Sequence, residues 1–234
     1  MKNTIQDKAK LVNSVFSKVY KKYDLMNDIM SLGVHRIWKS KLIDWMNPQL
    51  NENLIDVASG TGDIAKLFSK KNNNSAQITC VEPNDEMYFA GKFNLKNFKN
   101  IKWRKAKAEK LPFKNNTYDF YTISYGIRNV SDINLSLKEA LRVLKPGGRF
   151  MCLEFSKIDN KMINLLYQKY SKVIPIVGKY IAGSSKPYDY LIKSINEFYT
   201  QDELANLIKK NGFSNVEYRN LSNGISAIHS GWKI

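Results

Sequence analysis

Short apolar runs alternate with amphipathic stretches through the middle of the chain. The apolar runs predict strands at residues 53–57, 76–81, 101–105, 118–124 and 149–155. Between them, apolar side chains recur at helical spacing over residues 63–71, 85–93 and 135–144. Strands that alternate with helices of this length are typical of βαβ units, so we expect an α/β fold around a mostly parallel sheet.

Two further segments have helical spacing but no strand beside them. Residues 8–46 precede the first strand, and residues 161–193 follow the fifth and are longer than a simple crossover. After them, Thr200 opens a capping-box pattern that predicts a helix over residues 200–211. The remaining apolar runs, residues 213–220 and 225–231, predict a closing pair of antiparallel strands.

The chain is strongly basic. Lysine and arginine outnumber aspartate and glutamate 37 to 21, which gives a formal net charge of +16. Such a surplus attracts nucleic acids and anionic membrane surfaces. Most of it is lysine in a chain that is also rich in asparagine, and the few arginines, which suit bidentate contacts to bases, are scattered. We therefore favour a compositional bias and expect no nucleic-acid partner.

Cysteine and apolar content bear on the compartment. No apolar run reaches the length of a membrane span, and the first seven residues lack the apolar core of a signal peptide. Cys80 and Cys152 lie in strand-like segments, so a disulfide framework is not expected. With only His35 and His229 beside them, a metal site is not expected either. These observations predict a cytoplasmic chain.

A glycine-rich turn between a strand and a helix, within residues 54–63, carries the clearest chemical signal. Gly60 and Gly62 allow the backbone to approach a ligand closely. Glu82 ends the next strand, 20 residues after Gly62, at the spacing of a carboxylate that accepts bonds from ribose hydroxyls. A common glycine turn beside a surface glutamate is the structural alternative. The joint pattern favours a cofactor that contains a nucleoside.

Charge discriminates between two cofactors. The pattern Gly60-x-Gly62-x-x-Ala65 also fits a dinucleotide fingerprint, in which a pyrophosphate lies at the helix N-terminus. Here Asp56 precedes the turn and Asp63 lies in the first helical turn, so two carboxylates would repel a pyrophosphate. They suit a ligand that carries an ammonium and a sulfonium. The sequence therefore favours S-adenosylmethionine over NAD.

The sequence also resembles a known family, the ubiquinone/menaquinone biosynthesis C-methyltransferases, within the class I S-adenosylmethionine-dependent methyltransferases. The most specific motifs are Tyr-Asp-Leu-Met-Asn-Asp at residues 23–28, Gly-Ile-Arg-Asn at 126–129 and Leu-Glu-Phe-Ser-Lys at 153–157. Other matching segments span residues 15–16, 35–39, 56–63, 108–113, 122–125, 142–148, 212–213, 220–221 and 224–233. The resemblance therefore extends over nearly the full length.

The resemblance implies a set of cofactor contacts beyond the glycine turn. By position, these fall on Thr61, Glu82, Lys107, Ala108 and Ser124. Three positions depart from the family pattern. Glu82 stands where the family mostly has Asp, and Ser59 where it has Gly. Lys107 replaces Asn, so a backbone contact is expected there and at Ala108.

The resemblance also implies the architecture. We expect a Rossmann-like, doubly wound, mostly parallel seven-stranded sheet with an antiparallel closing strand. Residues 1–234 then form one class I methyltransferase domain, with an N-terminal helical cap over residues 1–48 and a helical insertion over residues 158–196. The basic, amphipathic stretch at residues 162–193 suits a prenyl channel or peripheral contact with the cytoplasmic membrane, and an ordinary core-facing helix is the alternative.

The implied reaction is methyl transfer from S-adenosylmethionine to a ring carbon of a polyprenylated hydroquinone. The substrate is 2-polyprenyl-6-methoxy-1,4-benzoquinol, demethylmenaquinol or both, and no metal is expected because the sulfonium already activates the methyl group. Arg128 is the candidate for stabilising a phenolate or handling a proton through water, and a structural ion pair is its alternative role. Asn129 and Tyr23 are candidates for orienting a hydroxyl.

Two other functions stay open on the sequence alone. An RNA methyltransferase would use the basic charge, but no nucleic-acid module is visible. A catalytically inactive scaffold subunit would keep the fold, but the glycine turn, Glu82 and Arg128 are intact. The sequence leaves open whether the chain acts alone, as a homodimer or in an assembly of quinone-biosynthesis enzymes.

Overall fold

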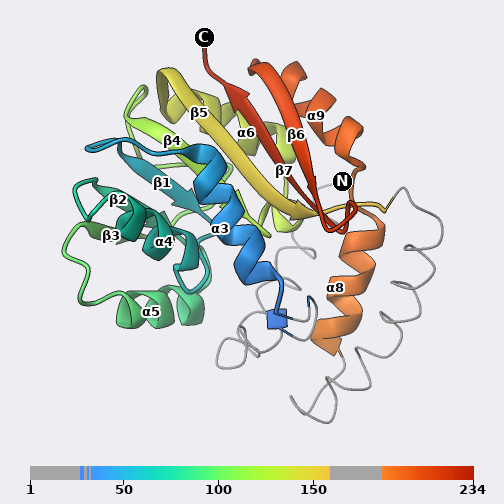
Figure 1. Ribbon diagram of the computed structural model, residues 1–234, viewed down its shortest axis with the longest axis horizontal. Helices are drawn as coiled ribbons and strands as arrows, with labels where there is room; N and C mark the ends of the chain where they lie inside the picture. Colours follow the sequence, from blue (N-terminus) through green and yellow to red (C-terminus); the bar gives the residue numbers. More distant parts are fainter. Residues whose placement is uncertain (1–26, 29–30, 32, 159–185) are drawn as a thin grey trace.

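A seven-stranded sheet forms the centre of the molecule (Figure 1). The computed structural model describes residues 27–28, 31, 33–158 and 186–234. The strands are β1 (Leu54–Val57), β2 (Ile78–Val81), β3 (Ile101–Arg104), β4 (Tyr118–Ser124), β5 (Leu144–Phe155), β6 (Ser214–Leu221) and β7 (Ser226–Trp232). They lie in the order β3-β2-β1-β4-β5-β7-β6.

The pairing matches the expected doubly wound sheet. Strands β1 to β5 pair in parallel, and β7 pairs antiparallel with both β5 and β6. From β1 the chain adds β2 and β3 on one side of the sheet and then β4 and β5 on the other, so the strand order reverses between the neighbouring strands β1 and β4. In open parallel sheets a ligand crevice forms outside the carboxyl ends of the strands at such a reversal. The prediction of a mostly parallel sheet with an antiparallel closing strand is confirmed.

Helices cover both faces of this sheet. They are α3 (His35–Met46), α4 (Asp63–Lys71), α5 (Asp85–Asn94), the short 3-10 helix η2 (Ile127–Asn129), α6 (Ile133–Val143), α8 (Lys186–Asn196) and α9 (Gln201–Lys210). One buried cluster joins the sheet to α3, α4 and α8, and a second joins the opposite face to α6 and α9 (Figure 1). The carboxyl ends of the strands therefore lie between two helical layers.

Local sequence signals place several helix ends where the patterns predict them. Helix α4 occupies residues 63–71, as expected. Thr200 caps α9, with the reciprocal bonds of a capping box between Thr200 and Glu203. Asp132 caps α6 by accepting a bond from the Leu135 backbone N–H.

Strand β5 begins earlier than expected. Residues 145–148 were predicted as a turn, but the structure includes them in a strand that starts at Leu144. Gly147 takes a φ of +77° and donates its N–H to the Lys233 carbonyl over 2.7 Å. The register with β4 shifts between Tyr118 and Phe120. The glycine turn is thus absorbed into the sheet as an irregularity that is bonded to Lys233 on one side, while the pairs with β4 lie at Leu144 and Arg149 on either side of it.

The predicted division into cap and insertion is described only in part. Helix α3 confirms helical structure before β1, and α8 confirms it at the end of the insertion. Residues 1–26 and 159–185 lie outside the described residues, so the domain boundaries stay predictions. Among the helices described, none is long and apolar enough to cross a membrane.

Candidate active site

The loop after β1 is fixed by short backbone and side-chain bonds. The Ser59 hydroxyl donates to the Asp56 carbonyl over 2.6 Å and accepts from the Val81 N–H over 3.1 Å. Gly60 and Gly62 both adopt positive φ angles, of 57° and 89°. At position 59, where the family has glycine, the serine side chain thus hydrogen-bonds to both β1 and β2 and holds the two strand ends together.

Close packing explains why glycine stands at position 62 of this loop and at position 91 of the neighbouring helix α5. A Cβ added to Gly62 would lie 2.5 Å from a methyl group of Leu95. A Cβ added to Gly91 of α5 would lie 2.2 Å from the Trp103 ring and 2.9 Å from the Gly60 carbonyl oxygen. Helix α5 can therefore approach the loop closely only with glycine at position 91.

Glu82 connects the loop to the end of β2. Its Oε2 accepts the Gly60 N–H and its Oε1 accepts the Asn84 N–H, each over 2.9 Å. Burial raises the pKa of Glu82 to about 7, although both of these bonds oppose the rise. The predicted ribose-binding carboxylate thus lies beside the glycine turn, and each of its oxygens keeps a second lone pair for another donor.

Asp56 lies at the base of the site, almost fully buried in β1. Its Oδ1 accepts the Thr122 hydroxyl over 2.8 Å, whereas its buried Oδ2 has no hydrogen-bond partner among the described residues. Burial raises the pKa of Asp56 to about 7, and the charge of Glu82 adds to the rise. A buried, unpartnered carboxyl oxygen costs free energy, so its presence indicates a place where a ligand donor fits.

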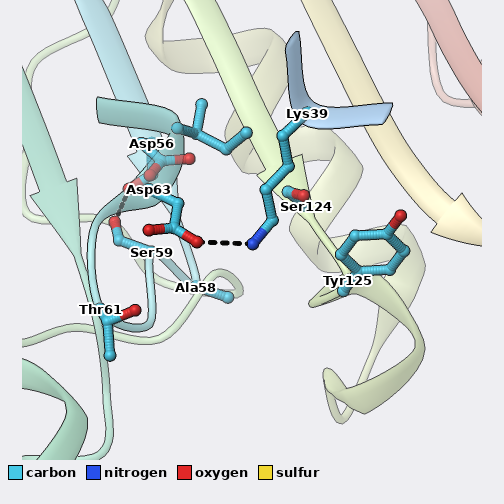
Figure 2. Close-up of a pocket in the computed structure, with 9 residues that line it drawn as sticks. Lys39, Asp56, Ala58, Ser59, Thr61, Asp63, Ser124 and Tyr125 are labelled. Carbon is cyan, nitrogen blue, oxygen red and sulfur yellow. Dashed lines mark hydrogen bonds and ion pairs between the residues drawn. The ribbon is translucent and has the colours of Figure 1, made fainter. Parts of the chain in front are cut away.

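A pocket lies directly above Asp56 (Figure 2). Four of the predicted cofactor residues, Asp56, Thr61, Asp63 and Ser124, contribute to its wall. The full lining is Lys39, Asp56, Ala58, Ser59, Thr61, Asp63, Ile64, Ser124 and Tyr125. The pocket thus joins the glycine loop, the start of α4 and the carboxyl end of β4, as the strand-end rule predicts.

Lys39 reaches into this pocket from α3. Its Nζ donates to Asp63 Oδ2 over 2.7 Å, and Figure 2 shows the two side chains meeting at the pocket. The Lys39 side chain is 7% exposed and that of Asp63 is 40% exposed. Burial raises the pKa of Asp63, but the neighbouring ammonium outweighs this effect and holds the pKa below its usual range.

Ser124 and Tyr125 form the wall at the end of β4. The Ser124 hydroxyl is buried and has no hydrogen-bond partner in the structure. Tyr125 has a φ of 55°, an uncommon value for a residue with a side chain, and its N–H donates to the Leu153 carbonyl over 2.7 Å. The chain turns sharply here, between the end of β4 and η2.

Lys107 and Ala108 follow β3 and do not belong to the described lining of this pocket. Ala108 is buried, and the Lys107 carbonyl accepts the Lys110 N–H over 3.1 Å in a tight turn. The Lys107 side chain is exposed. A cofactor contact at these two positions stays a prediction that the backbone would have to supply.

Arg128 forms a buried ion pair. Its guanidinium donates to the Glu154 carboxylate and, over 3.0 Å, to the Tyr125 carbonyl. Arg128 Nε and Glu154 Oε2 are both buried, and neither has a hydrogen-bond partner in the part of the chain that the structure describes. Burial raises the pKa of Glu154 and the arginine opposes the rise. The structural role that the sequence left open is thus present, and contact with substrate stays a prediction.

Asn129, the second ring-side candidate, joins η2 to α8. Its side-chain oxygen accepts the Tyr190 hydroxyl over 2.9 Å. Tyr23, the third candidate, lies outside the described residues. The structure therefore brings Arg128 and Asn129 onto one short helix next to Tyr125, but it does not test what they bind.

The two histidines take structural positions. His35 Nε2 lies 2.9 Å from Asp28 Oδ1. His229 Nε2 lies 2.9 Å from the Gln201 carbonyl, and burial lowers the pKa of His229 to about 4. Neither side chain lines the described pocket. Within the part of the chain that the structure describes, no group of three or more metal-binding side chains comes together.

Sequence reasoning named no role for Lys39, Tyr125, Glu154 or Tyr190. The first three lie within segments that carry the family resemblance, but their side chains reach partners from other elements. No periodicity or motif in the sequence indicates which residue each one meets. Tyr190 belongs to α8, where no sequence signal distinguishes it from a core aromatic residue.

Comparison with known proteins identifies the family. A model of the ubiE/COQ5 methyltransferase family matches residues 2–233. The ubiquinone/menaquinone biosynthesis C-methyltransferase UbiE of Rickettsia bellii (strain OSU 85-389) is 51% identical over 97% of this chain and 94% of its own length. The protein of the same name from Rickettsia prowazekii (strain Madrid E) is 50% identical over 96% and 93%.

Solved structures share the fold at low sequence identity. A Thermotoga maritima S-adenosylmethionine-dependent methyltransferase, described as a possible histamine N-methyltransferase, has a TM-score of 0.67 and 20% identity over 94% of this chain and 99% of its own. A Haemonchus contortus phosphoethanolamine N-methyltransferase 2, in complex with S-adenosyl-L-methionine, has a TM-score of 0.61 and 12% identity over 84% and 52%.

The sheet order and these structures define the class as the Rossmann-like fold of S-adenosylmethionine-dependent methyltransferases. Within that class, the chain belongs to the ubiE/COQ5 methyltransferase family. It is an S-adenosylmethionine-dependent C-methyltransferase of ubiquinone/menaquinone biosynthesis. The predictions of family, fold, enzyme class and methyl donor are confirmed at this level, and neither the RNA methyltransferase nor the scaffold alternative is favoured.

Proposed function

We propose that this chain methylates a ring carbon of a polyprenylated hydroquinone, namely 2-polyprenyl-6-methoxy-1,4-benzoquinol, demethylmenaquinol or both. The observation that carries the proposal is the match of about 50% identity over nearly the whole chain to enzymes named for both quinone pathways. The acidic pocket after β1 supports the choice of methyl donor.

The residues of the pocket fit S-adenosylmethionine, which supplies an electrophilic methyl group when bound. Asp56 and Asp63 suit its ammonium, and Glu82 suits its ribose hydroxyls. Two buried polar atoms without partners, Asp56 Oδ2 and Ser124 Oγ, offer further bonds. Thr61 of the glycine loop also lines the pocket. A pyrophosphate would meet the buried carboxyl group of Asp56 and the partly exposed one of Asp63, so this donor set favours a cationic ligand.

The hydroquinone ring that accepts the methyl group has to be bound as a phenolate, because a neutral aromatic carbon is a poor nucleophile. An arginine stays charged at any physiological pH, so Arg128 is suited to stabilise negative charge and not to remove a proton directly. Glu154 and the Tyr125 carbonyl fix its orientation. Asn129 and Tyr23 orient a ring hydroxyl in this proposal, with the proton leaving through bound water.

An incorporation assay tests the reaction. The purified protein is incubated with methyl-labelled S-adenosylmethionine and either a short-chain demethylated quinol or total RNA. We expect label in the quinol, on a ring carbon. Label in RNA alone would support an RNA methyltransferase, and label in neither would support a scaffold subunit. The Asp56→Asn protein serves as the control for donor binding.

We also propose peripheral contact with the cytoplasmic face of an anionic membrane, where a prenylated substrate resides. A described segment supports this: residues 85–106 carry six exposed basic side chains against two acidic residues, Asp85 and Glu86, and Lys105 pairs with Asp85 over 2.5 Å. These side chains are Lys92, Lys96, Lys99, Lys102, Arg104 and Lys105. Phe89 and Phe93 of α5 are 59% and 68% exposed among them. We call this surface the α5–β3 face.

The α5–β3 face combines two properties of membrane-binding surfaces. Lys105 Nζ lies 4.9 Å from the Phe89 ring centre, and Lys96 Nζ lies 4.6 Å from that of Phe93. Exposed aromatic rings enter the headgroup region of a membrane, while lysines attract anionic lipid heads. The other predicted surface, residues 162–193, falls mostly outside the described residues.

A further inference from the structure

Lys39 is a cation inside a pocket that the sequence predicted to be acidic. It belongs to α3, the helix before the sheet, and not to any strand end or to the glycine loop. Its side chain is almost completely buried, yet its ammonium lies on the pocket wall near Asp56, Ser124 and Tyr125 (Figure 2). Nothing in the predicted cofactor set accounts for a positive charge at this point.

The ion pair with Asp63 does not use the whole bonding capacity of this lysine. An ammonium group has three N–H donors, and among the described residues Asp63 is the one acceptor that Lys39 meets. Removing a charge from water costs several kcal/mol, so a buried ammonium is stable only when further acceptors complete its shell. The pocket side of Lys39 is the direction from which a ligand can supply them.

The two charges of the Lys39–Asp63 pair are also arranged to complement a free amino acid. Asp63 presents a carboxylate and Lys39 an ammonium, adjacent to each other on one wall. A free amino acid carries the opposite arrangement, an α-ammonium and an α-carboxylate on neighbouring atoms. The methionine part of S-adenosylmethionine is such a zwitterion, and the two charges of the pocket wall complement its two charges in turn.

We propose that Lys39 binds the α-carboxylate of the methyl donor while Asp63 binds its α-ammonium. The proposal rests on the proposed function, because it assumes that the donor occupies this pocket. It adds a specificity-determining residue from the N-terminal helical cap, so that α3 contributes to cofactor recognition as well as to the core. The structural alternative is that Lys39 only neutralises Asp63.

Decarboxylated S-adenosylmethionine separates these two roles, because it differs from the donor by the α-carboxylate alone. Binding of both ligands to the full-length protein is measured by calorimetry. We expect the wild-type protein to bind S-adenosylmethionine at least about tenfold more tightly than the decarboxylated ligand, the magnitude of a charge-assisted hydrogen bond. Equal affinity of the wild type for both ligands would overturn the proposal without any variant.

Variants assign the discrimination to one side chain. In Lys39→Met, we expect the preference for the carboxylated ligand to fall to within about threefold, while the dicationic decarboxylated ligand binds as well or better beside the unpaired Asp63. Lys41→Met, at an exposed position of the same helix, should keep the wild-type preference. Lys39→Gln retains a donor toward Asp63 and serves if Lys39→Met does not fold.

The outcomes are distinct. A Lys39→Met protein that keeps the full preference contradicts the proposal and supports the structural ion pair. A protein that binds neither ligand in its wild-type form contradicts the proposed donor site itself, and with it the function proposed above. Thermal unfolding of each variant shows whether a change in affinity reflects a change in folding.

Discussion

Asp56 is buried with one carboxyl oxygen that meets no donor among the described residues. Asparagine has nearly the same shape and keeps an oxygen that can accept the Thr122 hydroxyl, so Asp56→Asn removes charge with little change in packing. We expect the affinity for S-adenosylmethionine to fall by about tenfold to a hundredfold, because a charge-assisted bond to the ligand is lost. Stability should not fall, since the buried carboxyl group no longer needs to be desolvated.

Calorimetry with S-adenosylmethionine measures this change, and chemical denaturation checks the fold. Asp44→Asn is a suitable control, because Asp44 is exposed on α3 and pairs with the surface Lys71. Unchanged affinity in Asp56→Asn would mean that the ammonium of the ligand lies elsewhere.

The raised pKa values of Asp56 and Glu82, both about 7, make cofactor affinity depend on pH. A cationic ligand favours the ionised carboxylates and so lowers both pKa values on binding. Protons are therefore released on binding below about pH 7, and affinity rises with pH up to that value and then levels off. Each group contributes a slope of at most about tenfold per pH unit.

Titrations between pH 5.5 and 7.5 test this prediction, a range in which the α-amino group of the ligand stays largely protonated. The slope should be shallower in Asp56→Asn, which has lost one of the two groups. A wild-type affinity that stays flat across the range would show that neither carboxyl group titrates with binding.

The Arg128–Glu154 pair allows a test of catalysis separate from folding. Arg128→Met alone leaves a buried carboxylate unpaired and should destabilise the protein by about 3–5 kcal/mol. Adding Glu154→Leu removes that charge and should restore most of the stability. If Arg128 stabilises the phenolate, the double variant folds and binds the donor but transfers methyl groups at a greatly reduced rate. Recovery of near wild-type turnover in the double variant would assign Arg128 a structural role.

At the residue scale, the strand-end rule and the glycine turn pointed to Asp56 and Asp63, and the family resemblance pointed to Thr61 and Ser124. These four residues line one pocket, and their contacts with a cofactor stay predictions. Lys39 was missed because its role depends on how α3 crosses the sheet, and no residue spacing encodes that crossing.

At the scale of elements, the contact between α5 and the glycine loop depends on Gly91. Alanine has the higher helix propensity, by about 1 kcal/mol, yet its Cβ would lie 2.2 Å from the Trp103 ring. We expect Gly91→Ala to destabilise the protein by about 1–3 kcal/mol, because Trp103 and the loop must shift. Cofactor affinity should fall as well, since the same Cβ approaches the Gly60 carbonyl at 2.9 Å.

Thr200→Ala provides the comparison, because it weakens the cap of α9 at a site remote from the pocket. It should lower the free energy of unfolding by about 1 kcal/mol and leave cofactor affinity unchanged. Denaturant titration and calorimetry on both variants distinguish loop displacement from general destabilisation. A Gly91→Ala protein with wild-type stability and affinity would show that α5 moves freely against the loop.

Element boundaries followed from sequence where a cap or an apolar period ends clearly, as at α4 and α9. The start of β5 could not be predicted in this way, because the strand begins at Leu144 and not at the expected residue 149. The Lys-Pro-Gly-Gly segment has the composition of a turn, but its hydrogen bonds with Lys233 hold it in the sheet, and the pairing with β4 resumes after it at Arg149. Such an extension depends on a neighbour from the end of the chain, and local composition cannot show it.

For the whole molecule, alternation of strands and helices was enough to predict a parallel α/β sheet. The order of the strands was not accessible in the same way, because the pairing of β1 with β4 joins residues more than sixty positions apart. Right-handed crossovers and a shared crevice limit the choices but do not select one. The family resemblance supplied the seven-stranded architecture that the pattern alone left open.

The net charge of +16 becomes informative once the fold shows where part of it lies. On the α5–β3 face, Lys92 and Lys96 lie in and just after α5, beside the exposed rings of Phe89 and Phe93, so we expect the protein to float with phosphatidylglycerol-containing vesicles and not with phosphatidylcholine alone. Binding should weaken as salt rises, because exposed charges are screened. Lys92→Ala/Lys96→Ala should reduce partitioning by roughly thirtyfold, at about 1 kcal/mol for each lysine.

Phe89→Ser/Phe93→Ser tests the apolar part of the same face at little cost to folding, since both rings are exposed. Leu135→Ser, at a 49% exposed position on α6, is the matched control and should float like the wild type. Because aromatic insertion does not depend on salt, the phenylalanine variant should lose the binding that persists at high salt, whereas the lysine variant should lose the part that salt removes. Flotation that neither variant changes would place the membrane contact elsewhere, and retention of total RNA by this face without vesicle binding would make it a nucleic-acid surface.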